Sequence, residues 1–318
     1  FETMMQLTYL TFTAPRRDDD AFASYKNRSK AELQNMDLNP SSSFSDSITS
    51  TLYSKHPRTL RMKADMVDKM NYDKILSMYQ DRFKDASDFT FILVGNVDVE
   101  AVKPLIESYL GSLPSINRKE TFKDNHIAMR KGICKNEFIR QQETPKVNNF
   151  ICYSGTCKYN LRNEILMSMT DQLLNFIYTE KVREDEGGTY GVYPMGQLIK
   201  YPTEKAVLQI FFNTAPDKQE KLIKIIYDEA EAFAKNGPDE ASLNKVKEYM
   251  LKKHSEDLKE NGYWLNSIDE YLYTGIDPVK DYEQIINSIT PKDVQQFANE
   301  LLKQKNQITV SMISPEKK

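Results

Sequence analysis

Arg183 and Tyr190 are the two residues of this sequence whose types and spacing best suit work on a peptide, and they stand seven residues apart around a glycine pair. An Arg guanidinium carries five hydrogen-bond donors and stays charged, whereas a Tyr hydroxyl is a neutral donor. Either group can face a carbonyl oxygen on which negative charge develops during a reaction. These side chains can hold a peptide, but they cannot cleave one unaided.

The residues before Arg183 predict a helix that would position it. Apolar side chains recur there at three- and four-residue steps: Leu166, Met169, Leu173, Ile177 and Tyr178. Arg183 then falls in the last helical turn, and Gly187 and Gly188 end the helix. Tyr190 begins an extended segment, so a helix, a glycine stop and a strand would hold both side chains at one elbow.

A purely structural explanation of the same residues stays open at this point. A cation in the last turn complements the helix dipole, glycine commonly ends helices, and Tyr favours strands. On spacing alone, this explanation is the more common one for such a run.

Length and composition indicate a chain of about two domains. The sequence has 318 residues, of which 40% are hydrophobic, and 43 Lys and Arg face 46 Asp and Glu for a net charge of −3. This balance argues against a nucleic-acid partner. No apolar run approaches the roughly 20 residues that cross a bilayer, so no membrane span is predicted.

Cysteines and histidines predict neither a disulfide framework nor a metal site. Cys134, Cys152 and Cys157 are too few for such a framework, and Cys152 is expected to be a buried, unreactive side chain. His56, His126 and His254 lie at least 70 positions apart in sequence, and none has a second His within a helical turn. His254 is expected on a solvated helix face. We therefore predict no metal ligand and no cofactor in this chain.

An internal repeat is visible at an offset of about 220 residues. Residues 70–75 align with 289–294, and residues 89–94 align with 308–313, while residues 12–25 correspond loosely to 233–245. Helices mixed with antiparallel strands predict an α+β fold of two related domains, each an antiparallel sheet covered by helices. The second copy is expected to be complete and the first to begin partway.

The repeat predicts the following organisation of the chain. Residues 1–115 form the latter part of one domain, residues 116–136 a polar linker, and residues 137–318 a complete second domain. In the first copy we expect helices from Phe1, near residues 20–35 and from Tyr72, a polar loop at residues 39–43, and a strand at residues 89–94. In the second copy we expect strands near residues 147–153, 190–197 and 206–212, a helix at residues 161–182, and a last strand.

Three stretches of sequence carry a resemblance to a known family. The run from Arg183 to Val192 resembles the arginine-tyrosine motif in the last domain of the insulinase/pitrilysin family of zinc peptidases. The run Ile92–Asp98 and the run Leu105–Pro114 are similar to the end of a family domain. The resemblance covers nearly the whole chain. It implies the later half of a clamshell of four related domains, namely the end of the third domain and all of the fourth.

In this family, zinc is held by an inverted H-x-x-E-H motif in the first domain, which this chain lacks. The resemblance therefore implies a part that is inert alone, with zinc as the cofactor of the full-length enzyme. Its partners would be the N-terminal zinc-bearing half and a peptide substrate. Tyr190 would be the catalytic residue that stabilises the oxyanion, Arg183 would bind a substrate carbonyl with Tyr190, and Gly188 and Gly191 would let backbone approach.

Two alternatives remain beside this interpretation. The chain could be a companion subunit that pairs with a separate zinc-bearing chain, or a scaffold homologue that hydrolyses nothing. Retention of both Arg183 and Tyr190 favours a role in peptide binding over the scaffold. Substrate identity is not readable from the sequence. The resemblance to envelope members of the family suggests the bacterial periplasm as the compartment.

Overall fold

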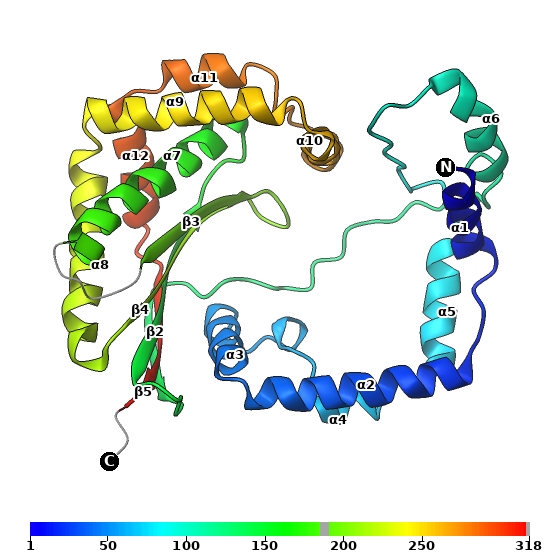
Figure 1. Cartoon of the computed structure of the whole chain (residues 1–318), viewed down its shortest axis with the longest axis horizontal. Coiled ribbons are helices and arrows are strands. Elements are labelled where there is room, and N and C mark those ends of the chain that lie inside the picture. The colour runs from blue at the N-terminus through cyan, green and yellow to red at the C-terminus, as the bar shows by residue number, and fades with distance from the viewer. Residues whose placement is uncertain (185–190, 316–318) are drawn as a thin grey trace. The chain divides into compact units, whose positions relative to one another are not determined.

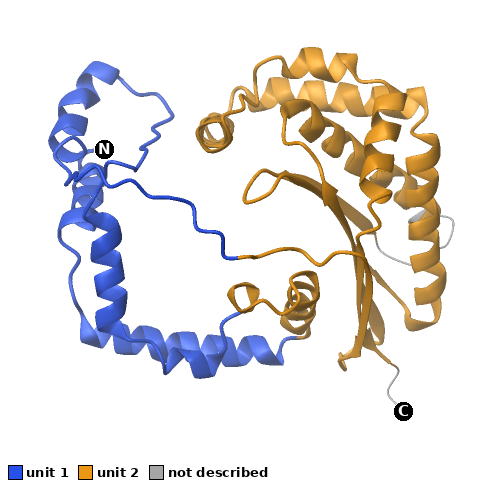
Figure 2. Cartoon of the chain, turned by 180° about the vertical axis from the view of Figure 1, so that it is seen from behind, with its two compact units in different colours: residues 1–39, 61–125 blue, residues 40–60, 126–318 orange. Residues whose placement is uncertain are grey.

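The computed structural model describes residues 1–184 and 191–315, and for Arg183 and Glu184 it describes the backbone alone. The chain separates into two compact units (Figure 2). Unit 1 comprises residues 1–39 and 61–125, and unit 2 comprises residues 40–60 and 126–318.

Unit 1 is helical. It contains α1 (Glu2–Thr13), α2 (Asp19–Leu38), α4 (Ala64–Val67), α5 (Tyr72–Phe83) and α6 (Val99–Tyr109) (Figure 1). The helices predicted from Phe1, near residues 20–35 and from Tyr72 are confirmed. Asp18 and Asn71 begin α2 and α5 by accepting backbone amides with their side chains. Phe12 of α1 packs edge-on against Phe83, with ring centroids 4.9 Å apart, and this pair anchors a small aromatic core.

The strand predicted at residues 89–94 is not formed. This stretch has no regular hydrogen-bonded structure, and Phe91 and Leu93 are exposed. The prediction rested on the apolar pattern, but a strand also needs a neighbour for its backbone groups. Unit 1 offers no other strand with which residues 89–94 could pair.

Unit 2 contains a mixed sheet. Its strands in the described residues are β1 (Ile133–Ile139), β2 (Lys146–Thr156), β3 (Val192–Ile199), β4 (Lys205–Thr214) and β5 (Gln307–Ser314). They lie in the order β1-β5-β2-β4-β3. All neighbours pair antiparallel except β1 with β5, which are parallel. Strand β1 begins inside the segment predicted as a linker, whose polar composition concealed it.

Helices cover both faces of this sheet. The helices of unit 2 are α3 (Pro40–Leu52), α7 (Leu161–Tyr178), α8 (Gln219–Asn236), α9 (Glu240–Asp257), α10 (Asn261–Thr274), α11 (Tyr282–Ser288) and α12 (Pro291–Leu302), with short turns η1 (Pro57–Thr59), η2 (Thr179–Glu184) and η3 (Pro216–Lys218). The α+β class and the helix-covered sheet are therefore as predicted. The sheet differs from the prediction in its parallel β1–β5 pair, and unit 1 contains no sheet. Among the described residues, no helix is both long and apolar enough to cross a membrane.

Strand β2 shows why the sheet is covered on two sides. Successive side chains of a strand point to opposite faces. Ile151 and Tyr153 enter the larger core beneath α7, α8 and α12, whereas Phe150 and Cys152 enter a smaller core on the other face. Cys152 is 1% exposed and burial raises its pKa to about 12, which confirms the expected buried thiol.

Helix α3 occupies residues for which a polar loop was predicted. The Ser-rich start at Pro40 is compatible with a first helical turn, because Pro is favoured there. Its apolar residues Ile48 and Leu52 pack on Phe150, Cys152 and their neighbours in the smaller core. Tertiary packing therefore outweighs the weak helix propensity of the serines. Although α3 follows α2 of unit 1, it belongs to unit 2.

The order of elements repeats along the chain, as the sequence alignment at about 220 residues predicts. Helices α1 to α5 recur in order as α8 to α12, and the capping residues Asp18 and Asn71 have counterparts in Asp239 and Thr290. The helix predicted at residues 161–182 and the strands predicted near residues 147–153, 190–197 and 206–212 correspond to α7 with η2, β2, β3 and β4.

Candidate functional site

The backbone on both sides of the predicted elbow is fixed by the core of unit 2. Helix α7 begins at Asn160, whose side chain accepts the amide of Asn163, and it continues without a break into the π-helical turn η2. Val182 in this turn is fully buried. On the far side, Val192 opens β3, is buried, and pairs with Phe212 of β4.

The predicted site residues fall at the join between these flanks. Arg183 lies in η2, where the wider turn of a π-helix is a feature often found at functional sites. Its side chain, together with Tyr190, Gly187 and Gly188, lies outside the described residues. Their predicted roles in catalysis and substrate binding stay predictions.

Gly191 is the one predicted site residue whose surroundings are described. A Cβ atom built on it would lie 2.7 Å from the hydroxyl oxygen of Tyr193. Tyr193 is exposed on β3, so its ring could move aside. Space at Gly191 therefore depends on a movable side chain, and the backbone approach predicted for this glycine stays a prediction.

A hollow of about 450 Å³ lies against both flanks of the elbow. Asn175 and Phe176 line it from the last turn of α7, and Pro194 lines it from the start of β3. Asp171, Gln172 and Tyr249 complete its lining. Strand β3 is the last strand of the described sheet on this side, so its outer edge is not paired by another described strand.

Asp171 joins the two flanks directly. Its carboxylate accepts the backbone amide of Gly196 in β3 at 3.0 Å. Burial raises the pKa of Asp171 to about 6, while hydrogen bonds from the amides of Gly196 and Gln172 oppose the rise. A Cβ atom on Gly196 would lie 2.4 Å from the sulfur of Met167, so α7 crosses β3 at a position that accepts only glycine without rearrangement.

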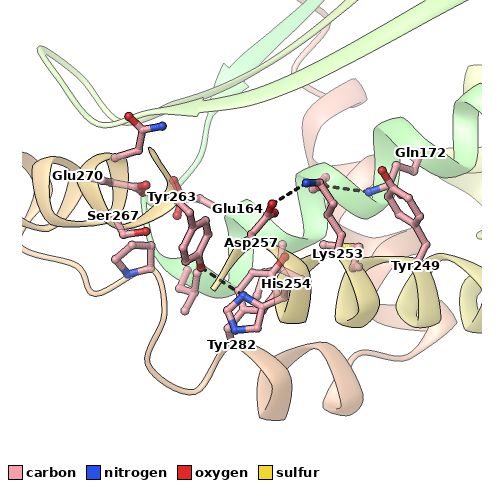
Figure 3. A pocket seen from close by; sticks show the side chains of 16 residues that line it. Glu164, Gln172, Tyr249, Lys253, His254, Asp257, Tyr263, Ser267, Glu270 and Tyr282 are labelled. Carbon is pink, nitrogen blue, oxygen red and sulfur yellow. Dashed lines mark hydrogen bonds and ion pairs between the residues drawn. The ribbon is translucent and has the colours of Figure 1, made fainter. Parts of the chain in front are cut away.

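A second pocket of about 480 Å³ opens between α7, α9 and α10 (Figure 3). Its polar lining includes Glu164 from α7, His254 and Asp257 from α9, and Glu270 from α10. Asp257 pairs with Lys253 at 2.5 Å, one turn before it on α9. The pocket therefore collects titratable groups from three helices.

Two carboxyl groups of this pocket share a hydrogen-bonding partner. Tyr159, which is itself buried, donates its hydroxyl to Glu270 at 2.9 Å. The pKa of Glu164 is raised to about 7, chiefly by burial, with Glu270 acting in the same direction and a hydrogen bond from Tyr159 opposing it. Glu164 is therefore poised to gain or lose a proton near neutral pH. Burial and the two glutamates also raise the pKa of Tyr159.

The prediction that His254 lies on a solvated helix face is wrong. His254 is 6% exposed, its ring stacks on Tyr282 at 4.4 Å, and its Nδ1 lies 3.2 Å from the hydroxyl of Tyr263. Its charged sequence neighbours suggested exposure, but the two tyrosines come from other helices and were invisible to a local pattern.

Glu164, Glu270 and Tyr159 are residues that sequence reasoning missed. They come from α7, from α10 and from the segment after β2, and no spacing motif connects them. The tertiary fold alone brings them together, so the signal could not be found in one sequence.

Among the side chains that the structure describes, in residues 1–182 and 191–315, no group of three or more His, Cys, Asp or Glu is placed to hold a metal ion. His56 instead caps η1, where its Nδ1 accepts the amide of Arg58 at 3.3 Å.

Comparison with known proteins gives the family. A family model described as the peptidase M16 inactive domain matches residues 69–250, which is more than half of the chain. The chain belongs to this family, and the resemblance to insulinase/pitrilysin peptidases noted in the sequence is confirmed.

Individual relatives are distant in sequence but alike in fold. The probable zinc protease PqqL of Escherichia coli (strain K12) is 21% identical over 311 residues, covering 95% of this chain and 32% of that protein. The crystal structure of the periplasmic protease PqqL from Escherichia coli matches with a TM-score of 0.84 at 18% identity, over 99% of this chain and 35% of that one. This chain thus spans about a third of the length of the curated relatives it matches.

The crystal structure of the first half of the periplasmic protease PqqL from Escherichia coli matches as well. Its TM-score is 0.76 at 14% identity, over 98% of this chain and 70% of that one. The fold of this chain is therefore also found in the first half of that relative.

Proposed function

We propose that this chain is the metal-free, substrate-gripping part of a zinc-dependent endopeptidase. It binds the peptide backbone through Arg183 and Tyr190, and it closes a chamber over a zinc site carried by an N-terminal half. The family assignment and the relatives named as zinc proteases support this proposal. The observation that carries it is the elbow: both flanks are anchored in the core and both line one hollow.

The two side chains have different proposed roles, because a guanidinium and a phenol differ in charge. A permanently charged guanidinium at position 183 binds a substrate carbonyl in the ground state and orients the peptide. A phenol hydroxyl at position 190 donates to the carbonyl oxygen as it becomes an oxyanion, which lowers the barrier of the step. Zinc, when bound in the other half, supplies the activated water. Gly188 and Gly191 leave room for the backbone of the peptide.

The compartment and partners follow from the same relatives. Because the structurally similar PqqL of Escherichia coli is described as a periplasmic protease, we propose the periplasm for this protein too. The N-terminal zinc-bearing half is proposed as its partner, in the same chain or in a companion subunit. The complete gene, or a neighbouring one, should then encode H-x-x-E-H.

Tyr190→Phe in the full-length enzyme tests the catalytic role. Loss of one oxyanion donor lowers kcat by about 10²-fold or more, while zinc content measured by atomic absorption stays at the wild-type level. Tyr193→Phe is the matched control, since it removes an exposed hydroxyl three residues further along, on β3, and should keep wild-type turnover. Equal turnover in Tyr190→Phe and wild type removes the role of Tyr190. If the full-length protein binds no zinc and cleaves no peptide, it is instead a scaffold homologue that hydrolyses nothing.

A further inference from the structure

The pocket between α7, α9 and α10 has the size and the walls of a small-molecule site. Its volume of about 480 Å³ lies within the range of roughly 300–1,000 Å³ that is usual for such sites. Tyr249 and Tyr263 line it with aromatic rings, and Leu161, Ile165 and Met250 line it with apolar side chains. A single metal ion would fill only a small part of this volume. The pocket therefore suits an organic ligand.

The charge of the pocket is predominantly negative. Of its three carboxyl groups, Asp257 has its own cation, because Lys253 lies 2.5 Å from it on the same helix. Glu164 and Glu270 form the carboxyl pair of this pocket, and among the described residues neither has an ion pair with a Lys, Arg or His side chain. The pocket therefore holds two carboxyl groups that no described cation neutralises.

The carboxyl pair shares a hydrogen-bonding network. A hydrogen bond joins Glu164 of α7 to Glu270 of α10, and Tyr159 donates its hydroxyl to Glu270 at 2.9 Å. Burial is the largest cause that raises the pKa of Glu164 to about 7, and Glu270 raises it further. In the empty pocket a proton on Glu164 therefore takes the place that a cation would have.

The other titratable groups around the carboxyl pair have partners of their own. His254 of α9 shares a hydrogen bond with the hydroxyl of Tyr263 at 3.2 Å and stacks on Tyr282 of α11. Lys200, between β3 and β4, donates to the last carbonyl oxygen of α10, and its Nζ lies 5.9 Å from the ring centroid of Tyr159. The charge of Lys200 is therefore directed to a backbone oxygen and an aromatic ring, and not to the carboxyl pair.

We propose that this pocket binds an organic cation, an alkylammonium or guanidinium group, at the carboxyl pair of Glu164 and Glu270. The N–H groups of the ligand donate to the two carboxylates, and the proton held by Glu164 leaves to solvent. Charge-assisted hydrogen bonds of this kind are the strong ones. The rings of Tyr249 and Tyr263 add faces that attract a cation. None of these residues belongs to the elbow, so the inference holds whether or not the protein cleaves peptides.

Two sources carry this chemistry, namely the side chain of a Lys or Arg in a polypeptide and a free polyamine. Gln172 and Tyr249 line both this pocket and the hollow beside the elbow. Figure 3 shows these two residues at one end of the pocket and Glu270 at the other. A ligand longer than the pocket can therefore continue from the carboxyl pair toward the hollow.

Isothermal titration calorimetry on the full-length protein tests the proposal. The probes are N-acetylarginine methylamide, N-acetyllysine methylamide and putrescine, with N-acetylcitrulline methylamide as the uncharged counterpart of the arginine probe. We expect one site per chain for the cations and at least tenfold weaker binding of the citrulline probe. If the arginine or lysine probe binds more tightly than putrescine, the ligand is a polypeptide side chain, and the reverse order identifies a free polyamine.

The pH dependence of binding distinguishes this site from a nonspecific acidic surface. Because a cation competes with the proton on Glu164, whose pKa is about 7, affinity should be about 30-fold lower at pH 5.5 than at pH 8. This comparison uses the wild-type protein and so does not depend on the folding of any variant.

Glu164→Gln and Glu270→Gln should each weaken binding at pH 8 by at least tenfold, and Glu164→Gln should remove most of the pH dependence. Glu248→Gln is the matched control, because Glu248 is exposed on α9 outside the pocket, and it should bind as the wild type does.

Four outcomes overturn the inference. They are no binding of the cationic probes at 10 mM, equal affinity for the arginine and citrulline probes, and equal weakening by Glu248→Gln and Glu164→Gln. The fourth is a pH dependence as steep in Glu164→Gln as in the wild type, because the exchanged proton would then belong to another group such as His254.

Discussion

Asp171 on α7 and Gly196 on β3 are joined by a hydrogen bond of 3.0 Å between a partly buried carboxylate and a backbone amide. The bond satisfies a backbone amide of β3, whose outer edge is not paired by another described strand. It also fixes the crossing point of the two elements that lead into and out of the elbow. The position of the proposed peptide-binding residues therefore depends on this contact, although it lies outside the motif.

Gly196→Ala should disturb the packing of α7 on β3 and so destabilise the protein. The added Cβ atom would lie 2.4 Å from the sulfur and 3.3 Å from the carbonyl oxygen of Met167, whose side chain is buried and cannot swing away freely. Overpacking of this kind costs about 1–3 kcal/mol. Urea denaturation of the purified protein should show a free energy of unfolding reduced by that amount.

Gly262→Ala is the matched control for Gly196→Ala. Nothing lies within 4 Å of a Cβ atom at this position in the first turn of α10. The substitution should leave stability unchanged or raise it by about 0.4–1 kcal/mol, because Ala reduces the entropy of the unfolded chain. If both alanine variants unfold at the same urea concentration as the wild type, α7 and β3 are not in close contact at Gly196.

Local patterns predicted most of unit 2 because its elements carry strong periodicity. The helix of residues 161–178 has apolar residues at helical spacing, and β2 contains the apolar run Phe150–Tyr153, which the two-sided burial of the sheet explains. By contrast, α3 begins with a Ser-rich stretch that reads as a loop, and it is helical because Ile48 and Leu52 have a sheet to pack on. The apolar run at residues 89–94 does not form a strand for the opposite reason, because it has no partner strand with which to pair.

The residues of the candidate site also differ in whether the sequence alone could reveal them. Arg183 and Tyr190 are visible in the sequence because they belong to one short motif that resembles a family hallmark. Glu164 and Glu270 are separated by more than a hundred residues, and their relationship exists only after α7 and α10 have packed beside one pocket. His254 illustrates the same limit, because Tyr282 buries it from another helix.

Glu164→Gln should flatten the pH dependence of stability. The pKa of Glu164 in the folded protein is about 7, above its ordinary value of 4.5, so the folded state retains a proton that the unfolded chain has lost. The stability linked to this group is present below pH 4.5 and lost as the pH rises through 7. Urea denaturation at pH 5, 6, 7 and 8 should show wild-type stability falling across this range.

In Glu164→Gln the fall between pH 5 and pH 8 should be at least halved, because the amide does not titrate. Glu248→Gln removes an exposed carboxylate from α9 and should leave the wild-type slope intact. Parallel curves for Glu164→Gln and wild type would mean that Glu164 ionises in the folded protein as freely as in the unfolded chain.

Asp85→Asn should release the segment that follows α6 in unit 1. The Asp85 carboxylate accepts the backbone amides of Ser87 at 3.0 Å, Ile116 at 3.0 Å and Arg118 at 2.6 Å. Burial alone would raise the pKa of Asp85, but these hydrogen bonds lower it below its ordinary value of 3.8. The stability it contributes is therefore present above pH 3.8 and lost as the pH falls further.

The Asn side chain has one acceptor oxygen, so its amide group would face the Arg118 amide as a second donor. Hydrogen exchange followed by mass spectrometry should then be at least tenfold faster at the Arg118 amide in Asp85→Asn, since an amide without its acceptor exchanges through local opening. Asp88→Asn changes an exposed carboxyl nearby and should leave this exchange at the wild-type rate. Equal protection of the Arg118 amide in Asp85→Asn and wild type would show that the segment is held by its other contacts, such as the Ala86 amide on the Pro114 carbonyl oxygen at 2.8 Å, and not by the carboxylate.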